Sequence, residues 1–331
     1  MKDWTAERYA EEILKGNRIA LSKSITLVES TLASHREKAA KIVELCMAQP
    51  KDTIRIGISG VPGVGKSTFI EAFGNYLIGE GNKVAVLAVD PSSTLTKGSI
   101  LGDKTRMEIL SRNQDAYIRP SPSSGVLGGV AAATREALIL CEAAGFNIIL
   151  IETVGVGQSE IAVKSMVDFY LLLMLSGAGD ELQGIKRGIM EMADAILINK
   201  ADGDNLDNAK RARSTYKNAL HLFPASESGW IPEVATCSAL NDEGIDKAWE
   251  IIFKYVRQTK GNNFFAKNRQ NQAVFWMHES IETELKKSFY QKEEIIEKIK
   301  GFEKAIKNNE TSSLNAAAQL LELYFSKFST H

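Results

Sequence analysis

The chain has 331 residues, of which 44% are hydrophobic and 24% are charged, as in an ordinary folded globular protein. Its 40 Lys and Arg residues are balanced by 41 Asp and Glu residues, so the formal net charge is −1 and no surface for nucleic acid is indicated. The longest fully apolar run, residues 169–175, is too short to span a bilayer, and residues 1–7 lack a secretory signal, so we expect a cytoplasmic protein without a membrane partner.

The first 50 residues are predicted to be helical. Apolar residues recur there at roughly helical spacing among charged ones, and Pro50 closes the segment. We interpret residues 1–50 as an N-terminal helical extension that packs against the domain that follows.

A phosphate-binding loop is predicted after a buried strand at residues 53–59 and before a helix at residues 67–78. The loop reads Gly60-Val61-Pro62-Gly63-Val64-Gly65-Lys66-Ser67, and Thr68 follows it. Its glycines let backbone N–H groups turn toward phosphate oxygens, and the helix start adds the positive end of its dipole. Lys66 supplies a charge to the β- and γ-phosphates, and the Ser67 hydroxyl ligates Mg²⁺. The sequence therefore predicts a nucleoside triphosphate site.

Strand-like and helix-like segments alternate from residue 53 to about 257, which predicts an α/β fold of the P-loop NTPase type with a mostly parallel sheet and helices on both faces. Further strands are expected at residues 83–90, 116–120, 147–152, 169–174, 195–199 and 234–238. Ligands of such sheets lie outside the carboxyl ends of the strands, so the following residues are expected to line one site: Gly60, Asp90, Glu152, Asn199 and Ser238. We therefore expect a P-loop nucleotide-binding domain at residues 51–260 and a C-terminal helical arm at residues 261–331.

A guanine-reading motif is predicted at Asn199-Lys200-Ala201-Asp202, directly after a strand. The Asp202 carboxylate accepts both N–H donors of the guanine edge, whereas adenine would leave that acceptor unpaired. The Asn199 amide reaches the ring and the loop backbone, and the Lys200 stem lies along the base. The stretch Ser238-Ala239-Leu240 after the next strand supports this prediction, so GTP is favoured over ATP.

Carboxylates at two strand ends, Asp90 and Glu152, are candidate Mg²⁺ ligands. Residues 152–155 resemble the DxxG switch of GTPases with Glu for Asp, and Gly155 would give a backbone N–H to the γ-phosphate. Val156 stands where Ras-like enzymes carry the glutamine that orients water. We therefore expect slow intrinsic hydrolysis unless Gln158, a second subunit or a partner supplies the missing contact.

Longer stretches resemble the MeaB/ArgK family of GTPase chaperones for adenosylcobalamin-dependent acyl-CoA mutases, chiefly methylmalonyl-CoA mutase. These stretches are Asp90-Pro91-Ser92-Ser93, residues 98–107, residues 152–160 and residues 177–186. The resemblance covers residues 10 to 257, and the C-terminal part is similar only in being helical. It implies Mg²⁺ surrounded by Ser67, Asp90, Asp103 and Glu152, a third switch at residues 177–186 that relays the nucleotide state to the mutase, and a homodimer made by the C-terminal arm.

Three alternative functions remain at this stage. A metallochaperone for nickel enzymes would need a Cys/His cluster, whereas the three cysteines and four histidines are scattered along the chain. A transport-associated ATPase or kinase for basic amino-acid uptake is disfavoured by the guanine motif. A GTP-dependent binding module without enzymatic activity is favoured by Val156, and a turnover measurement would separate it from a GTPase.

Overall fold

The fold is described from a computed structural model, which covers residues 4–48, 51–89, 107–120, 127–153, 158–177, 187–224 and 226–328. The chain divides into two compact units, Met1–Ala273 and Val274–His331. The division of the chain expected from the sequence, at residues 50 and 260, stays a prediction.

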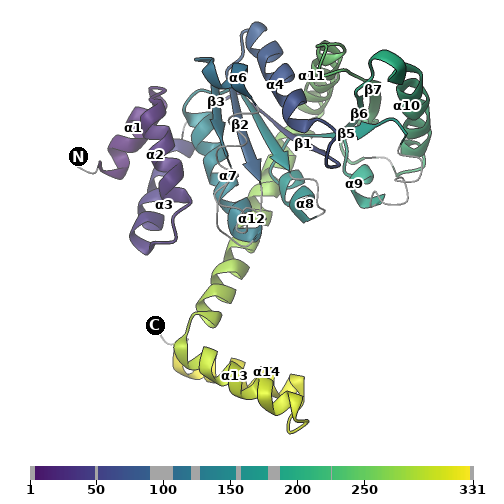
Figure 1. Cartoon of the computed structure of the whole chain (residues 1–331). Coiled ribbons are helices and arrows are strands. Elements are labelled where there is room, and N and C mark those ends of the chain that lie inside the picture. Colours follow the sequence, from purple (N-terminus) through teal and green to yellow (C-terminus); the bar gives the residue numbers. More distant parts are fainter. Residues whose placement is uncertain are drawn as a thin grey trace. The chain divides into compact units, whose positions relative to one another are not determined.

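A seven-stranded parallel sheet forms the centre of the first unit, with strand order β3-β2-β4-β1-β5-β6-β7 (Figure 1). The strands are β1 (Ile54–Gly60), β2 (Val84–Val89), β3 (Ala116–Arg119), β4 (Ile148–Thr153), β5 (Phe169–Leu175), β6 (Ala195–Asn199) and β7 (Glu233–Thr236). Strands such as β5 and β6 are apolar along nearly their whole length because a parallel sheet is covered on both faces. The α/β fold predicted from the sequence is confirmed.

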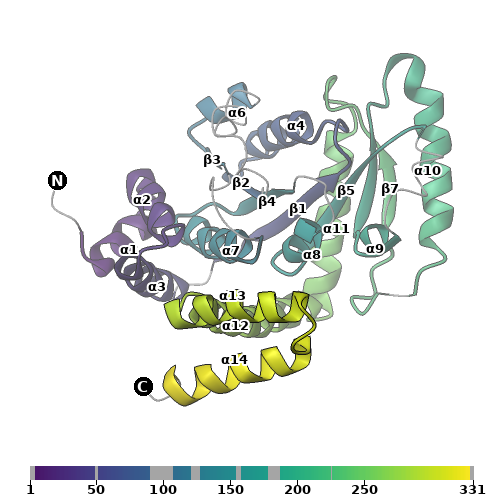
Figure 2. The ribbon, with the colours of Figure 1, turned by 60° about the horizontal axis from the view of Figure 1, so that its bottom comes forward.

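Helices cover both faces of this sheet. They are α4 (Lys66–Gly79), α6 (Glu108–Arg112), α7 (Leu127–Ala143), α8 (Gln158–Lys164), α9 (Arg187–Glu191), α10 (Leu206–Leu220), α11 (Ile245–Gly261) and the first part of α12 (Phe264–Tyr290), with a short 3-10 helix, η2 (Gly203–Asn205). Figure 2 shows α4 and α6 on one side of the sheet and α7 and α8 on the other. Phe69 and Phe73 of α4 and Ile252 of α11 are fully buried in one cluster with side chains of the central strands.

Among the described residues before the sheet are the helices α1 (Ala6–Leu14), α2 (Arg18–Val28) and α3 (Ala33–Met47), so the helical character predicted for residues 1–50 is confirmed there. Asn17 caps α2 by accepting from two backbone N–H groups of the first turn. Arg18 at the start of α2 donates to the carbonyl oxygens of Gln114 and Ala116, at 2.9 and 2.5 Å, where β3 begins. The N-terminal helices are therefore joined to the edge strand of the sheet.

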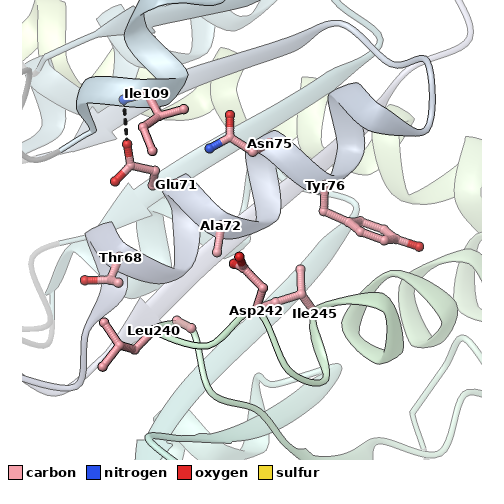
Figure 3. Close-up of a pocket in the computed structure, with 10 residues that line it drawn as sticks. Thr68, Glu71, Ala72, Asn75, Tyr76, Ile109, Leu240, Asp242 and Ile245 are labelled. Carbon is pink, nitrogen blue, oxygen red and sulfur yellow. Dashed lines mark hydrogen bonds between the residues drawn. The ribbon is translucent and has the colours of Figure 1, made fainter.

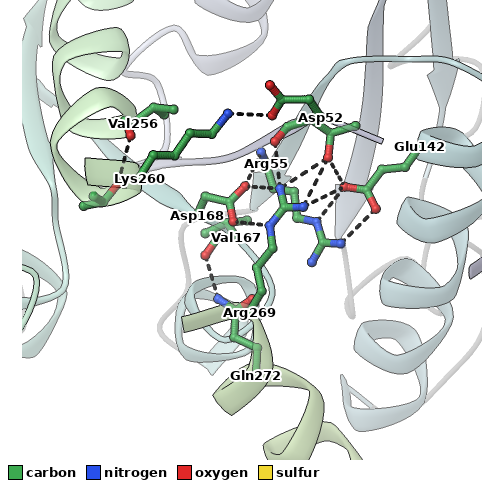
Figure 4. Close-up of polar contacts among 11 residues, drawn as sticks. Asp52, Arg55, Glu142, Val167, Asp168, Val256, Lys260, Arg269 and Gln272 are labelled. Atoms are coloured by element: carbon green, nitrogen blue, oxygen red, sulfur yellow. Dashed lines mark hydrogen bonds and ion pairs between the residues drawn. The ribbon is translucent and has the colours of Figure 1, made fainter. Parts of the chain in front are cut away.

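A network of largely buried ion pairs, of which only the Asp168 carboxylate is fully buried, fixes the start of α12 to the sheet (Figure 4). Arg269 donates to both carboxylate oxygens of Asp168, with Nε–Oδ1 and Nη2–Oδ2 distances of 2.7 and 2.6 Å. Arg55 of β1 makes a second two-pronged pair with Glu142 of α7, with both distances 2.8 Å. Burial raises the pKa of Glu142, but the hydrogen bonds and charge of Arg55, with the charge of Arg269, outweigh it and leave the pKa below its ordinary value. The network lies at the amino ends of the strands, opposite the phosphate loop.

The second unit consists of the rest of α12 with α13 (Glu293–Lys307) and α14 (Ser313–Phe328). Within it, the rings of Phe289 and Tyr324 lie 5.3 Å apart between centroids, and the hydroxyls of Ser288 and Tyr324 are 2.7 Å apart. The helical C-terminal region predicted from the sequence is confirmed. Throughout the described part of the chain, no helix is both long and apolar enough to cross a membrane.

Candidate functional site

The predicted phosphate loop connects β1 to α4, and its backbone path requires glycine. A Cβ on Gly60 would lie 2.5 Å from the carbonyl oxygen of Leu173, and Gly65 has a φ of +92°. Lys66 is the first residue of α4, and the N-cap residue, Gly65, has no side chain that could cap the N–H groups of the first turn. A loop of this form presents backbone donors and the positive end of a helix dipole to a ligand, which suits a phosphate group.

The Lys66 ammonium lies over this loop. Its Nζ donates to the carbonyl oxygens of Gly60 and Val61, at 2.8 and 3.3 Å. Burial lowers the pKa of Lys66, and the charges of Glu152 and Glu160 act in the opposite direction. Among the described residues, the printed bonds of this ammonium go to two loop carbonyl oxygens, so it lies beside the loop where an anionic oxygen could be bound.

Two oxygen donors meet at the start of α4. The Ser67 hydroxyl donates to Oε1 of Glu152, which stands near the end of β4, at 3.2 Å. A hydroxyl and a carboxylate are ligands that Mg²⁺ prefers, so the pair fits the predicted metal position. Asp90, Asp103 and Gly155 lie outside the described residues, and Gln158 is described only as the first residue of α8. In the described ranges, no group of three or more His, Cys, Asp or Glu residues is arranged to hold a metal ion.

The predicted base-reading residues are joined to the phosphate loop by hydrogen bonds. Asn199 at the end of β6 donates from Nδ2 to the Val64 carbonyl oxygen at 2.8 Å and accepts at Oδ1 from the Ala239 N–H at 3.1 Å. Lys200, which has a left-handed φ of 57°, donates from Nζ to the Gly63 carbonyl oxygen at 2.9 Å. The two loops are thus held as one surface, although more than 130 residues separate them.

The carboxylate of Asp202 is held by its neighbour on the next loop. Oδ2 of Asp202 accepts from the Ser238 hydroxyl at 2.5 Å, and the Ser238 oxygen also accepts from the Asn241 N–H at 3.3 Å. The adjoining Leu240 side chain is 80% exposed. These contacts orient the Asp202 carboxylate. The Ser238 hydroxyl bonds to Oδ2 of that carboxylate and not to Oδ1.

A cavity of 420 Å³ lies beside these loops, between α4, α6 and the residues after β7 (Figure 3). Its lining residues are Thr68, Glu71, Ala72, Asn75, Tyr76, Ile109, Ala239, Leu240, Asp242 and Ile245. Figure 3 shows Thr68 and Leu240, both predicted from the sequence, at the same end of the cavity. The other wall residues of α4 and α6 were not predicted, because no sequence motif marks the outer face of a helix.

Three further polar residues were not predicted as site residues. Ser59 near the end of β1, Thr153 at the end of β4 and Glu160 of α8 form a buried hydrogen-bonded row. A sequence signal for Glu160 exists. It precedes Val163 by three residues in a helical segment, so the two share a face. A carboxyl group on the apolar face of a helix marks a candidate functional position.

Known proteins resemble this chain over most of its length. A family model described as "Methylmalonyl Co-A mutase-associated GTPase MeaB" matches residues 21–294. The chain is 46% identical over 308 residues to "GTPase ArgK" of Escherichia coli (strain K12), with 93% of each chain covered. It is 45% identical to "Methylmalonic aciduria type A homolog, mitochondrial" of Mus musculus, covering 97% of this chain and 80% of the other. A solved structure titled "Crystal structure of LAO/AO transport system kinase" matches with a TM-score of 0.78 and 38% identity, over 98% of each chain.

Proposed function

Because this chain belongs to the MeaB family of methylmalonyl Co-A mutase-associated GTPases, we propose that its phosphate loop and strand-end loops form a GTP site whose state is read by a mutase. The chain is a GTPase, and its bound nucleotide is a guanine nucleotide. In this proposal residues 60–67, with Thr68, hold the phosphates, which receive backbone N–H groups of the loop and of the first turn of α4. Lys66 exchanges its bonds to the Gly60 and Val61 carbonyl oxygens for the β- and γ-phosphates.

The proposal that the bound base is guanine rests mainly on the carboxylate of Asp202. In our proposal it accepts from the two N–H groups on the guanine edge, and Ser238 keeps it in position. Asn199 and Lys200 tie this carboxylate to the phosphate loop, so base and phosphates are bound by one connected surface. Ala239 and Leu240 border the base from the loop after β7.

A binding competition tests the base assignment. In the Asp202→Asn variant the amide accepts one N–H and presents its own donors to the other, so we expect the preference for GTP over ATP to fall about 100-fold. Asp204→Asn, two residues away and exposed, is the matched control and should keep the wild-type preference. Displacement of a fluorescent guanine nucleotide by GTP and by ATP measures both variants. Unchanged discrimination in Asp202→Asn would remove the guanine role from this carboxylate.

We also propose that Ser67 and Glu152 hold Mg²⁺, together with Asp90 and Asp103. The close approach of the Ser67 and Glu152 oxygens supports the first pair. Bound there, the metal ion would neutralise charge on the phosphates. Gly155 would give its N–H to the γ-phosphate, and Gln158 would orient the attacking water in place of the glutamine that is absent at position 156. Intrinsic hydrolysis in this proposal is slow and is raised by the partner.

The proposed partner is an adenosylcobalamin-dependent acyl-CoA mutase, most directly methylmalonyl-CoA mutase, and the proposed task is to gate cofactor loading or protection. The description of the matching family and the name of the mouse relative support this partner. A gate of this kind needs the GTP and GDP forms to differ in mutase affinity by about 1–3 kcal/mol. Residues 177–186 would relay the difference, residues 261–331 would form a homodimer arm, and the protein would act in the cytoplasm.

A further inference from the structure

Three polar side chains form a buried row just below the phosphate loop, on the face of the sheet that α8 covers. The exposed fractions of Glu160, Ser59 and Thr153 are 0%, 1% and 0%. The Thr153 hydroxyl donates to the Ser59 oxygen at 2.9 Å, and the Ser59 hydroxyl donates to Oε1 of Glu160 at 3.4 Å. Burying a carboxyl group is unfavourable by several kcal/mol unless hydrogen bonds compensate, so its place here calls for an explanation.

The packing of α8 on β1 brings Glu160 to this place. A Cβ on Gly57 would lie 2.8 Å from Cγ1 of Val163, so the missing side chain lets α8 lie directly against the strand. Ser59 follows Gly57 by two residues and therefore lies on the same face of the sheet. Glu160 precedes Val163 by three residues and therefore lies on the same face of α8. The helix runs antiparallel to the strand, and Glu160 comes to lie opposite Ser59.

The row joins two strands at the point where their backbone pairing ends. The last residue pair in the register of β1 and β4 is Ile58 with Glu152, and Ser59 and Thr153 are the next residues of the two strands. Gly60 follows Ser59 and accepts from Lys66, while Glu152 accepts from Ser67. Side-chain hydrogen bonds therefore connect the strand ends that carry the proposed phosphate and metal contacts, and Glu160 connects them to α8.

We propose that Glu160 is a positioning residue for GTP hydrolysis, which acts through Ser59 and Thr153 to hold the ends of β1 and β4 in the arrangement that turnover requires. This inference rests on the proposed nucleotide site. The Glu160 side chain is fully buried and bonds to Ser59, so in this proposal it acts on the strand ends and not on the nucleotide itself. Its loss should therefore affect the reaction more than nucleotide affinity. Its charge also acts with that of Glu152 to raise the pKa of Lys66, against the effect of burial.

The decisive variant is Glu160→Gln, which keeps the volume of the side chain and removes its charge. We expect kcat for GTP to fall about 10- to 100-fold, because small displacements of reacting groups have effects of this size. KM for GTP and the Kd for GDP should stay within about twofold of wild type. A wild-type kcat in Glu160→Gln, or a change confined to KM, would overturn the proposal.

A double-mutant cycle with Ser59→Ala separates positioning from simple damage. If Glu160 acts through Ser59, the double variant should have the kcat of the slower single variant, whereas independent effects would multiply. Thr259→Val is the control for loss of a buried hydroxyl. Its oxygen bonds to the Tyr255 carbonyl at 2.7 Å within α11, and its removal should lower Tm while leaving kcat unchanged. Multiplicative loss in the cycle, or an equal loss of kcat in Thr259→Val, would contradict a positioning role.

The variant Lys66→Ala tests the proposed nucleotide site separately from the role of Glu160. Loss of GTP binding or turnover in Lys66→Ala with wild-type turnover in Glu160→Gln would refute the role of Glu160 alone. Wild-type binding and turnover in Lys66→Ala would refute the proposed phosphate loop itself. Binding of a non-hydrolysable GTP analogue shows whether Glu160→Gln is folded. If it is not, Ser59→Ala takes its place: a lower kcat with an unchanged KM supports the proposal, and a wild-type kcat or a change confined to KM overturns it.

Discussion

Replacing Arg269 by methionine should destabilise the first unit strongly, since it leaves a carboxylate in the interior without its main partner. The side chain of Asp168 is 1% exposed, and Arg269 covers it with two hydrogen bonds of 2.7 and 2.6 Å. Arg269 also donates to the Thr53 carbonyl oxygen at 2.8 Å, so the variant loses contacts to two segments of the chain. Methionine retains most of the aliphatic stem, and the loss is therefore mainly one of charge and hydrogen bonding.

The size of the stability loss in Arg269→Met depends on the hydrogen bonds that Asp168 retains. Removing one partner of a buried ion pair costs about 3–5 kcal/mol in stability. Asp168 still accepts from the backbone N–H of Arg55 at 2.8 Å, so we expect the lower end, about 3 kcal/mol. Such a loss is a large part of the total stability of a domain, which is about 5–15 kcal/mol.

Urea unfolding followed by circular dichroism measures the effect as a shift of the midpoint at unchanged slope. Lys260→Met is the matched control from the same region (Figure 4), because the Lys260–Asp52 bond of 2.5 Å is exposed and should contribute less than about 1 kcal/mol. The double variant Arg269→Met with Asp168→Asn should be less destabilised than the sum of the two single variants. A loss in Arg269→Met no larger than that in Lys260→Met would refute the reasoning.

Three shorter predictions concern other parts of the first unit. Lys66→Ala should abolish nucleotide binding or turnover, and wild-type turnover in a phosphate-release assay would exclude the phosphate-loop assignment. Gly57→Ala should lower stability by about 1–3 kcal/mol, because its methyl group would press on Val163 of α8, and an unchanged Tm would contradict that packing. The pKa of Glu142 is lowered in the folded state, so this group stabilises the fold above its unfolded pKa of about 4.5, and that contribution is lost as the pH falls through the folded value. When the free energy of unfolding is measured as the pH is lowered below about 4.5, it should therefore decrease less in Arg55→Met than in wild type. An equal decrease in both proteins would contradict the pairing.

Local patterns predicted much of the fold. The strand expected at residues 195–199 is β6 with the same bounds, because a short apolar run with two β-branched isoleucines, bounded by polar residues, is typical of a buried strand. The strand expected at residues 234–238 ends instead at Thr236, and Ser238 forms an antiparallel bridge with Glu243. Left-handed residues at Asp242 and Gly244 turn the chain there, and turn chemistry of this kind is not visible in hydrophobic periodicity.

The candidate site was predictable to the extent that it is encoded by short motifs. Asn199 and Asp202 could be placed beside the phosphate loop because parallel strands bring their carboxyl ends to one edge of a sheet. The sequence marks Glu160 as a carboxyl group on the apolar face of a helix, but its contact with Ser59 could not be predicted. That contact depends on how closely α8 packs on β1 at Gly57, more than 100 residues earlier in the chain. The role of Asp103 rested on resemblance and stays a prediction.

The most direct test of the central claim is the rate of GTP hydrolysis by the full chain, alone and with the methylmalonyl-CoA mutase of the same organism titrated in. Phosphate release is followed at saturating GTP and Mg²⁺, with Lys66→Ala in parallel to exclude a contaminating hydrolase. We predict a slow basal rate that rises and saturates with mutase, and no activity in the variant. A basal rate that stays constant across the titration, while GTP remains bound, would contradict the proposed gate on this mutase.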